Sequence, residues 1–75
     1  MSPLNELRPG DDATVASIGG DLPLRQRLAA LGLRPGRTVR LVRRGALAGP
    51  LHLRLGTTDV ILRRRHADAI TVHRR

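Results

Sequence analysis

The sequence predicts a mainly β fold: a small, strongly bent barrel of about five short strands with one short helix. Three observations support this fold class. The chain has 75 residues, enough for one hydrophobic core, so residues 1–75 are expected to form a single domain. Apolar residues alternate with polar ones in short segments separated by Gly and Pro, which is typical of half-buried strands. Only one segment has helical spacing. Closing such short strands into a barrel removes the exposed edges that a flat sheet would leave.

The first strand is expected over residues 13–18, where apolar side chains alternate imperfectly with small polar ones. A turn at Pro9-Gly10 precedes it, and Gly19-Gly20 ends it. Both dipeptides favour turns, since Gly accepts positive φ and Pro fixes φ near the value a turn needs.

The helix is expected from Asp21 to Leu31. Asp21 can cap the first turn, and Gly32 follows where a helix end needs a left-handed residue. Leu33 can then fold back onto the helix, as in a Schellman ending. Three leucines recur at i, i+4 and i+7 and are expected to pack on the core: Leu24, Leu28 and Leu31.

The remaining strands follow turn signals in the second half of the chain. Pro35-Gly36 is a strong turn signal. A hairpin connection is expected over residues 56–59, and a short turn is expected around residues 66–68. Between these turns, alternating apolar residues predict strands over residues 38–42, 51–55, 60–62 and 70–73.

Several residue types are missing, and their absence excludes whole classes of chemistry. The chain contains no Cys, which excludes disulfides, thiolate metal sites and a cysteine nucleophile. It contains no Lys, which excludes a Walker-type phosphate loop and Schiff-base catalysis. Its apolar runs are far shorter than a membrane span, and its acidic N-terminal region is unlike a signal peptide. A soluble protein is therefore expected.

All 14 basic residues are Arg, against six acids, and the net charge is +8 at pH 7. Three interpretations are open: a nucleic acid partner, an anionic membrane surface or acidic protein partner, or merely a basic solvated surface. The densest charge lies at Arg43-Arg44 and over residues 63–65. However, the chain has no aromatic residue, so it lacks both the stacking platforms of single-strand binders and the groove with which SH3 domains hold proline-rich peptides.

The segment Arg27–Gly36 resembles the FeoA family of ferrous-iron transport accessory proteins, and the resemblance extends over most of the chain. Its most specific element is the Leu-Gly-Leu-x-Pro-Gly connection at residues 31–36. The opening segment Leu4–Gly10 fits the family as well. Further matching positions are Gly49-Pro50, Leu62-Arg63-Arg64, Ala67 and Ile70-Thr71-Val72.

This resemblance implies an SH3-like β-barrel with an inserted helix. It also implies a non-enzymatic, cytoplasmic regulator that acts with FeoB, a membrane-embedded ferrous-iron transporter with a cytosolic GTPase domain. The module is similar to the C-terminal domain of DtxR-type iron-dependent repressors, but a chain this short lacks their DNA-binding domain. Gly49 departs from the family pattern, which often has an acidic residue just before Pro50. The leading alternative function is a basic small barrel that binds nucleic acid.

Two segments are candidate partner contacts. The first is the helix and the turn after it, with Arg25, Arg27, Gly32, Arg34, Pro35 and Gly36. The glycines and the proline are explained by the helix end and the turn alone, whereas the arginines beside them are not. The second is the loop of residues 45–49, whose apolar Leu47 has no evident role in the core.

The sequence contains no recognised metal signature, and no cofactor is expected to be required. His66-x-Asp68 is the nearest approach to one, with His52 as a further candidate. Two ligands bind a divalent ion such as iron or zinc weakly unless a second copy of the chain completes the site. The alternative is that these are solvated surface groups. No Ser or Thr stands in a recognised catalytic pattern with a His, so no catalytic site is predicted and the protein is not expected to be an enzyme.

Overall fold

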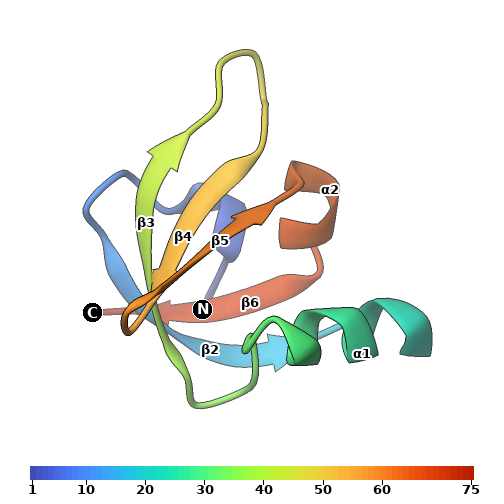
Figure 1. Cartoon of the computed structure of the whole chain (residues 1–75). Coiled ribbons are helices and arrows are strands. Elements are labelled where there is room, and N and C mark those ends of the chain that lie inside the picture. Colours follow the sequence, from blue (N-terminus) through green and yellow to red (C-terminus); the bar gives the residue numbers. More distant parts are fainter.

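The computed structural model describes all 75 residues as a single antiparallel sheet of six strands with three short helical segments (Figure 1). In chain order the elements are β1 (Ser2–Pro3), the 3-10 helix η1 (Leu4–Glu6), β2 (Asp12–Ile18), α1 (Leu22–Ala30), β3 (Thr38–Arg44), β4 (Leu51–Leu55), β5 (Thr58–Leu62), α2 (Arg64–Ala67) and β6 (Ile70–Arg74).

The sheet has the strand order β1-β6-β2-β3-β4-β5 and curls so that β2 and β6 cross below β3, β4 and β5 (Figure 1). The register shifts between Val15 and Ser17 on β2 and between Leu41 and Arg43 on β3. Such bulges increase local twist and bend the strand that carries them. They help the short sheet to wrap around its core.

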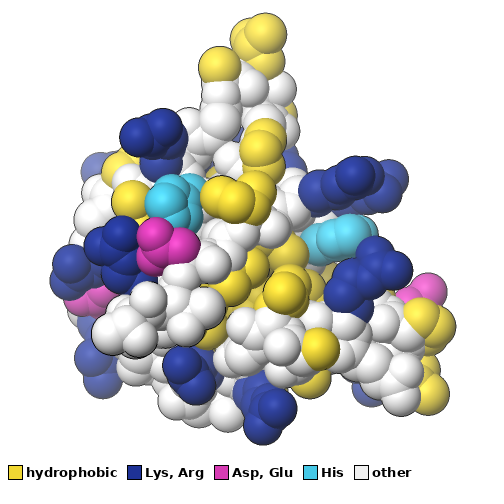
Figure 2. Space-filling view, viewed as in Figure 1, with side chains coloured by type: hydrophobic (Ala, Val, Ile, Leu, Met, Phe, Trp, Pro, Cys, Tyr) yellow, Lys and Arg dark blue, Asp and Glu magenta, His cyan; other side chains and the backbone are white.

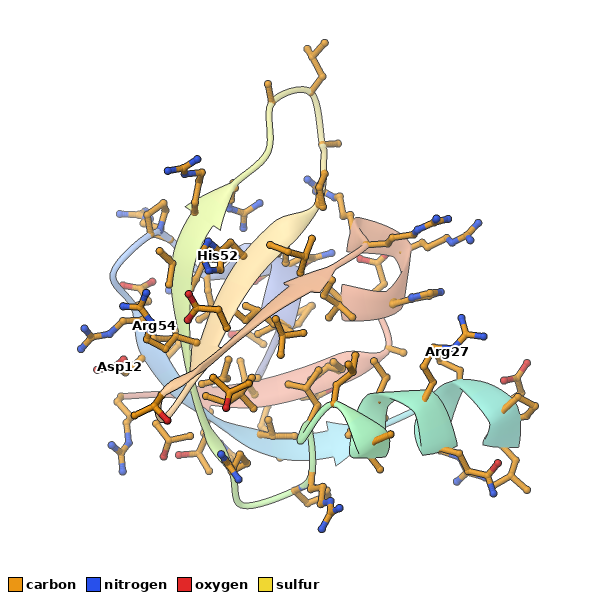
Figure 3. All side chains as sticks on the ribbon, viewed as in Figure 1. Asp12, Arg27, His52 and Arg54 are labelled. Carbon is orange, nitrogen blue, oxygen red and sulfur yellow. The ribbon has the colours of Figure 1, made fainter.

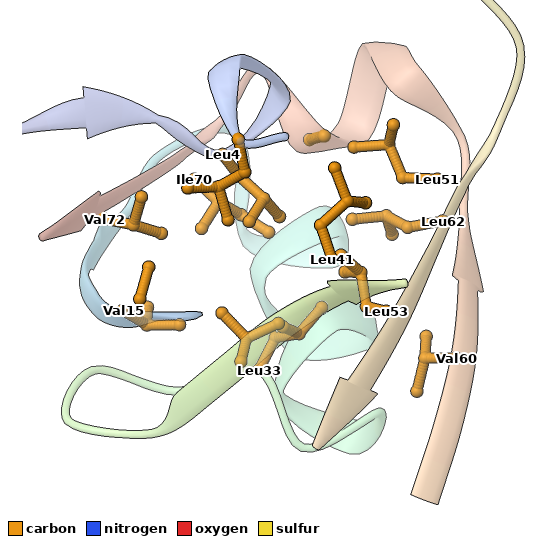
Figure 4. Packing of buried hydrophobic residues seen from close by; sticks show 14 of the residues in the cluster. Leu4, Val15, Leu33, Leu41, Leu51, Leu53, Val60, Leu62, Ile70 and Val72 are labelled. Atoms are coloured by element: carbon orange, nitrogen blue, oxygen red, sulfur yellow. The ribbon is translucent and has the colours of Figure 1, made fainter. Parts of the chain in front are cut away.

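The core consists of 16 buried residues, all of them apolar, and nine of these are leucines (Figure 4). The alternation predicted from the sequence places them there. On β4, Leu51, Leu53 and Leu55 are buried, while His52 and Arg54 lie on the opposite side. We call the side of the sheet that faces away from the core its outer face.

Three details differ from the sequence-based expectations. The short strand β1 was not predicted, because two residues are too few to show an alternating pattern. The predicted turn around residues 66–68 is largely a helical turn, α2, which buries Ala67. The predicted hairpin connection is shorter than expected, since Thr58 and Asp59 already belong to β5.

The helix α1 packs on the core through fewer leucines than predicted. Leu28 is fully buried and Leu24 is partly buried against the core, but Leu31 is 39% exposed. The prediction that Leu31 packs in the core is therefore wrong. The chain reverses direction just after Leu31, and Leu33, which follows the reversal, is buried in the core.

Candidate partner-binding surfaces

Local capping interactions fix both ends of α1, as predicted. The carboxylate of Asp21 accepts a hydrogen bond from the Leu24 N–H at 2.9 Å, which satisfies one of the free donors at the helix start. At the other end, Gly32 has φ +96°. The N–H of Gly32 donates to the carbonyl of Ala29 at 2.9 Å, and the N–H of Leu33 donates to that of Leu28 at 3.0 Å. These are the two bonds of a Schellman ending.

The turn after the helix is tied to β2. Gly36 has φ +90°, and its N–H donates to the carbonyl of Val15 at 2.8 Å. The N–H of Val15 donates in return to the carbonyl of Arg37 at 2.8 Å. Gly32 and Gly36 therefore have conformational roles, whereas Arg34 and Pro35 remain exposed between them.

The helix–turn surface comprises Arg25 and Arg27 on α1 together with Arg34, Pro35 and Gly36 in the turn. Its three arginines are exposed, and none of them forms an ion pair or a side-chain hydrogen bond. Figure 3 shows that the side chain of Arg27 points from α1 towards α2 and not towards the turn. Leu22 at the start of the helix is 56% exposed, so apolar and cationic side chains are mixed on this surface.

Leu47 lies on a different part of the molecule from the other candidate contacts. The β3–β4 loop projects from the top of the view in Figure 1, whereas the turn at Pro35-Gly36 lies at the bottom. The side chain of Leu47 is fully exposed. The prediction that Leu47 has no role in the core is confirmed. The structure therefore divides the predicted contact residues into two surfaces.

A shallow, open hollow lies below this loop. Its walls combine apolar residues with three consecutive arginines and contain no acidic residue: Ala48, Gly49, Pro50, Ile61, Arg63, Arg64 and Arg65. Ile61, which is 64% exposed, escaped the sequence analysis. The alternation along β5 could have revealed it, since Val60 and Leu62 on either side point into the core.

The outer face of the sheet carries two arginine–aspartate pairs, and Figure 3 labels one member of each, Asp12 and Arg54. The guanidinium of Arg40 donates from Nε to the Asp12 carboxylate at 2.8 Å, and that of Arg54 donates from Nε to Asp59 at 2.8 Å. The hydrogen bond from Arg40 lowers the pKa of Asp12. The hydrogen bond from Arg54, followed by the close contact with His52, lowers the pKa of Asp59 from 3.8 to about 2.

Two other arginines have structural roles that the sequence did not reveal. The guanidinium of Arg44 donates to the backbone carbonyls of Leu7 and Asn5, which ties the N-terminal segment to the end of β3. Arg74 donates to the Glu6 carbonyl at 2.6 Å. Arg44 therefore belongs to the framework of the fold, although the sequence analysis counted it among the densest surface charge.

The candidate metal ligands are divided between two places. His52 Nε2 lies 3.1 Å from an oxygen of Asp59 on the outer face, a close contact without the geometry of a well-directed hydrogen bond. His66 lies on α2 and Asp68 just after it, where the Asp68 carboxylate accepts a hydrogen bond from the Asn5 amide. Nowhere in the chain do three or more His, Cys, Asp or Glu side chains gather in a group that could hold a metal ion.

The family model described as the FeoA domain matches residues 2–74. The chain belongs to the FeoA family. A relative from Porphyromonas gingivalis, an Fe(2+) transport protein A/Fe(2+) transporter FeoB fusion protein, is 33% identical over 69 residues. That match covers 92% of this chain and 8% of the fusion protein.

Solved structures of FeoA proteins share the fold. The FeoA protein of Chlorobium tepidum is 35% identical, with a TM-score of 0.88, over 96% of this chain and 69% of that one. The FeoA protein of Stenotrophomonas maltophilia, described as an SH3 domain protein and solved with zinc, is 32% identical with a TM-score of 0.78, over 92% of this chain and 86% of that one. These likenesses confirm the predicted SH3-like fold and the association of the family with ferrous-iron transport.

A manganese-dependent transcriptional repressor contains the same module within a longer chain. It is 28% identical with a TM-score of 0.88, and the match covers 97% of this chain but 41% of the repressor. No helix of the present structure has the length and apolar character needed to cross a membrane.

Proposed function

We propose that this FeoA-family protein is a cytoplasmic accessory protein that binds the cytosolic part of a FeoB-type transporter and modulates ferrous-iron transport without catalysing a reaction. The observation that carries the proposal is the Porphyromonas gingivalis fusion protein, in which a domain related to this chain and an FeoB transporter form one polypeptide. When two domains share one chain, contact between them is favoured by their high effective concentration. A separate FeoA-type protein has to provide that contact through its own surface.

The helix–turn surface is the contact that we propose. Arg25, Arg27 and Arg34 lack intramolecular acidic partners, so they remain free to attract an acidic partner and to steer its approach. The exposed Leu22 and Leu31 nearby supply apolar area, which stabilises the bound state once water is excluded. The hydrogen bonds that tie the turn to β2 fix this surface before binding, which limits the entropy lost on association.

Metal binding to one chain is proposed to be weak and not required for folding. His66 and Asp68 provide two ligands at most, and Asp68 already accepts a hydrogen bond from Asn5. A divalent ion such as iron or zinc needs three or four convergent ligands for tight binding. A second copy of the chain could complete such a site, and metal binding would then depend on protein concentration.

The test is binding of purified protein to the immobilised cytosolic domain of a FeoB-type transporter. Arg25→Glu/Arg27→Glu is expected to weaken binding roughly tenfold or more, because charge reversal opposes an acidic partner. Arg63→Glu/Arg64→Glu is the matched control, since it changes the net charge equally but at residues outside the helix–turn surface. Both variants are first compared with the unaltered chain by thermal unfolding, to establish that they fold.

An equal loss in the two double variants would contradict the proposed surface, and no binding by the unaltered chain would contradict the proposed function. The nucleic-acid alternative has its own signature. Binding to phosphates falls steeply between about 50 and 200 mM salt, because each phosphate contact releases counterions. Tight, sequence-selective retention of labelled nucleic acid at about 150 mM salt, without transporter binding, would favour that alternative.

A further inference from the structure

The β3–β4 loop presents an apolar tip that the proposed transporter contact does not use. Its residues 45–50 read Gly-Ala-Leu-Ala-Gly-Pro and include no charged or hydrogen-bonding side chain. Leu47 at the tip is fully exposed. A single exposed leucine on a flat surface needs no explanation, but this one stands at the end of a projecting loop (Figures 1 and 2).

The backbone of the loop holds Leu47 in this position. Leu47 has φ +55° and Ala48 has φ +61°, two successive left-handed conformations that side-chain-bearing residues rarely adopt. The Gly45 N–H donates to the Pro50 carbonyl at 2.8 Å, and the Gly49 N–H donates to the Ala46 carbonyl at 3.0 Å. These two hydrogen bonds close the loop, so the tip is a defined convex knob.

The glycines that flank the tip have little room for a side chain. A Cβ on Gly49 would lie 2.9 Å from the carbonyl oxygen of Ala46, and one on Gly45 would lie 3.0 Å from Pro50. Both distances are too short for ordinary contact. A side chain at position 49 would therefore force the backbone to move, and one at position 45 would require Pro50 to shift slightly.

Cationic side chains surround the base of the knob. Arg63, Arg64 and Arg65 line the hollow below it, which contains no acidic residue, and none of the three forms an ion pair or a side-chain hydrogen bond. Arg43 is also exposed near the end of β3. Figure 2 shows apolar side chains at the top of the view and basic side chains on either side below them.

We propose that this end of the molecule docks on the surface of an anionic phospholipid bilayer. Leu47 enters the interfacial region between headgroups and acyl chains, and Arg63, Arg64 and Arg65 contact lipid phosphates. An apolar protrusion above a basic collar suits a bilayer surface, because one surface provides both an apolar layer and negative charge. Duplex nucleic acid offers the negative charge but no apolar layer for Leu47. The turn at Pro35-Gly36 lies at the opposite end of the molecule from the β3–β4 loop (Figure 1), and this proposal does not depend on the transporter contact.

The first experiment measures co-sedimentation with vesicles of 30 mol% phosphatidylglycerol in phosphatidylcholine, with pure phosphatidylcholine vesicles for comparison. Arg63→Gln/Arg64→Gln/Arg65→Gln is expected to lose on the order of 100-fold in partitioning, since each arginine near the surface contributes roughly fivefold. The matched control, Arg25→Gln/Arg34→Gln/Arg37→Gln, removes the same charge from α1 and the turn after it and leaves out Arg27, whose side chain points towards α2 (Figure 3). It is expected to lose less than about fivefold, because salt screens distant charges. Equal losses in the two triple variants would overturn the proposal.

The second experiment asks whether the tip enters the bilayer. Because the chain has no tryptophan, Leu47→Trp introduces a single fluorescent reporter, and Leu31→Trp on the far surface is its control. A blue shift with anionic vesicles is expected for the probe at position 47 alone. Leu47→Asn, which keeps a residue tolerant of positive φ, is expected to weaken vesicle binding several-fold. No blue shift at position 47, or full binding by Leu47→Asn, would show that charge alone holds the protein at the vesicle and would overturn the insertion of Leu47.

Discussion

Gly32 stabilises the fold through its backbone conformation and not through space for a close contact. Its φ is +96°, whereas a Cβ built on it would lie 3.9 Å from the nearest atom, Leu55 Cδ2, which is ordinary van der Waals contact. Gly32→Val therefore introduces no clash of the Cβ atom. It does force a β-branched residue into a left-handed conformation, which costs about 1–2 kcal/mol or more.

The expected change in melting temperature follows from the size of the chain. Unfolding entropy is about 2.1 cal/mol/K per residue, or about 0.16 kcal/mol/K for a chain of this length. A loss of about 1–2 kcal/mol then lowers the melting temperature by roughly 6–13 °C. Far-UV circular dichroism is the suitable assay, because the chain has no tryptophan or tyrosine for intrinsic fluorescence.

Two control variants separate the conformational cost from other effects. Gly32→Asn is expected to recover most of the loss, since asparagine tolerates positive φ. Gly19→Ala is expected to be nearly neutral, because Gly19 does not have positive φ and its Cβ would lie 3.5 Å from the Ala69 carbonyl oxygen. A melting temperature unchanged by Gly32→Val would refute the assigned helix ending.

Two further predictions concern titration and metal binding. The pKa of Asp59 is about 2 in the folded chain against 3.8 ordinarily, so the ionised carboxylate stabilises the fold above about pH 4, and this stabilisation is lost as the pH falls towards 2. Asp59→Asn is expected to flatten the dependence of the urea midpoint on pH in this window. An unchanged slope would count against the pair with Arg54. Calorimetry with zinc is expected to show micromolar or weaker binding per monomer. His66→Ala is expected to reduce this binding more than His73→Ala does. One tight site that is insensitive to His66→Ala would contradict the choice of His66 as a ligand.

Features set by neighbouring residues could be predicted from the sequence. The burial of Leu51, Leu53 and Leu55 follows from strand alternation. The helix ending at Gly32 follows from the order of residue types, since only the residue after the last helical turn needs positive φ. In both cases the deciding interactions lie within a few residues of each other in the chain.

Features that depend on strand register could not be predicted. Arg54 pairs with Asp59 because β4 and β5 are joined through Gly56-Thr57, which sets the two residues directly opposite each other. The predicted connection spanned residues 56–59, so it placed Asp59 in the turn and did not predict its pairing with Arg54. The contact from Arg44 to the carbonyl of Leu7 joins residues 37 positions apart, so no local pattern points to it.

The distribution of paired and unpaired arginines bears on the choice between partners. Binding along a nucleic acid backbone requires a continuous basic track. Here the pairs Arg40–Asp12 and Arg54–Asp59 neutralise charge on the outer face of the sheet, and Arg44 is occupied by backbone carbonyls. Apart from Arg8, Arg37 and Arg75, the unpaired arginines fall into two groups, one on the helix–turn surface and one below the Leu47 tip. Because each group adjoins exposed apolar side chains, the net charge of +8 supports two separate contacts better than one extended electrostatic surface.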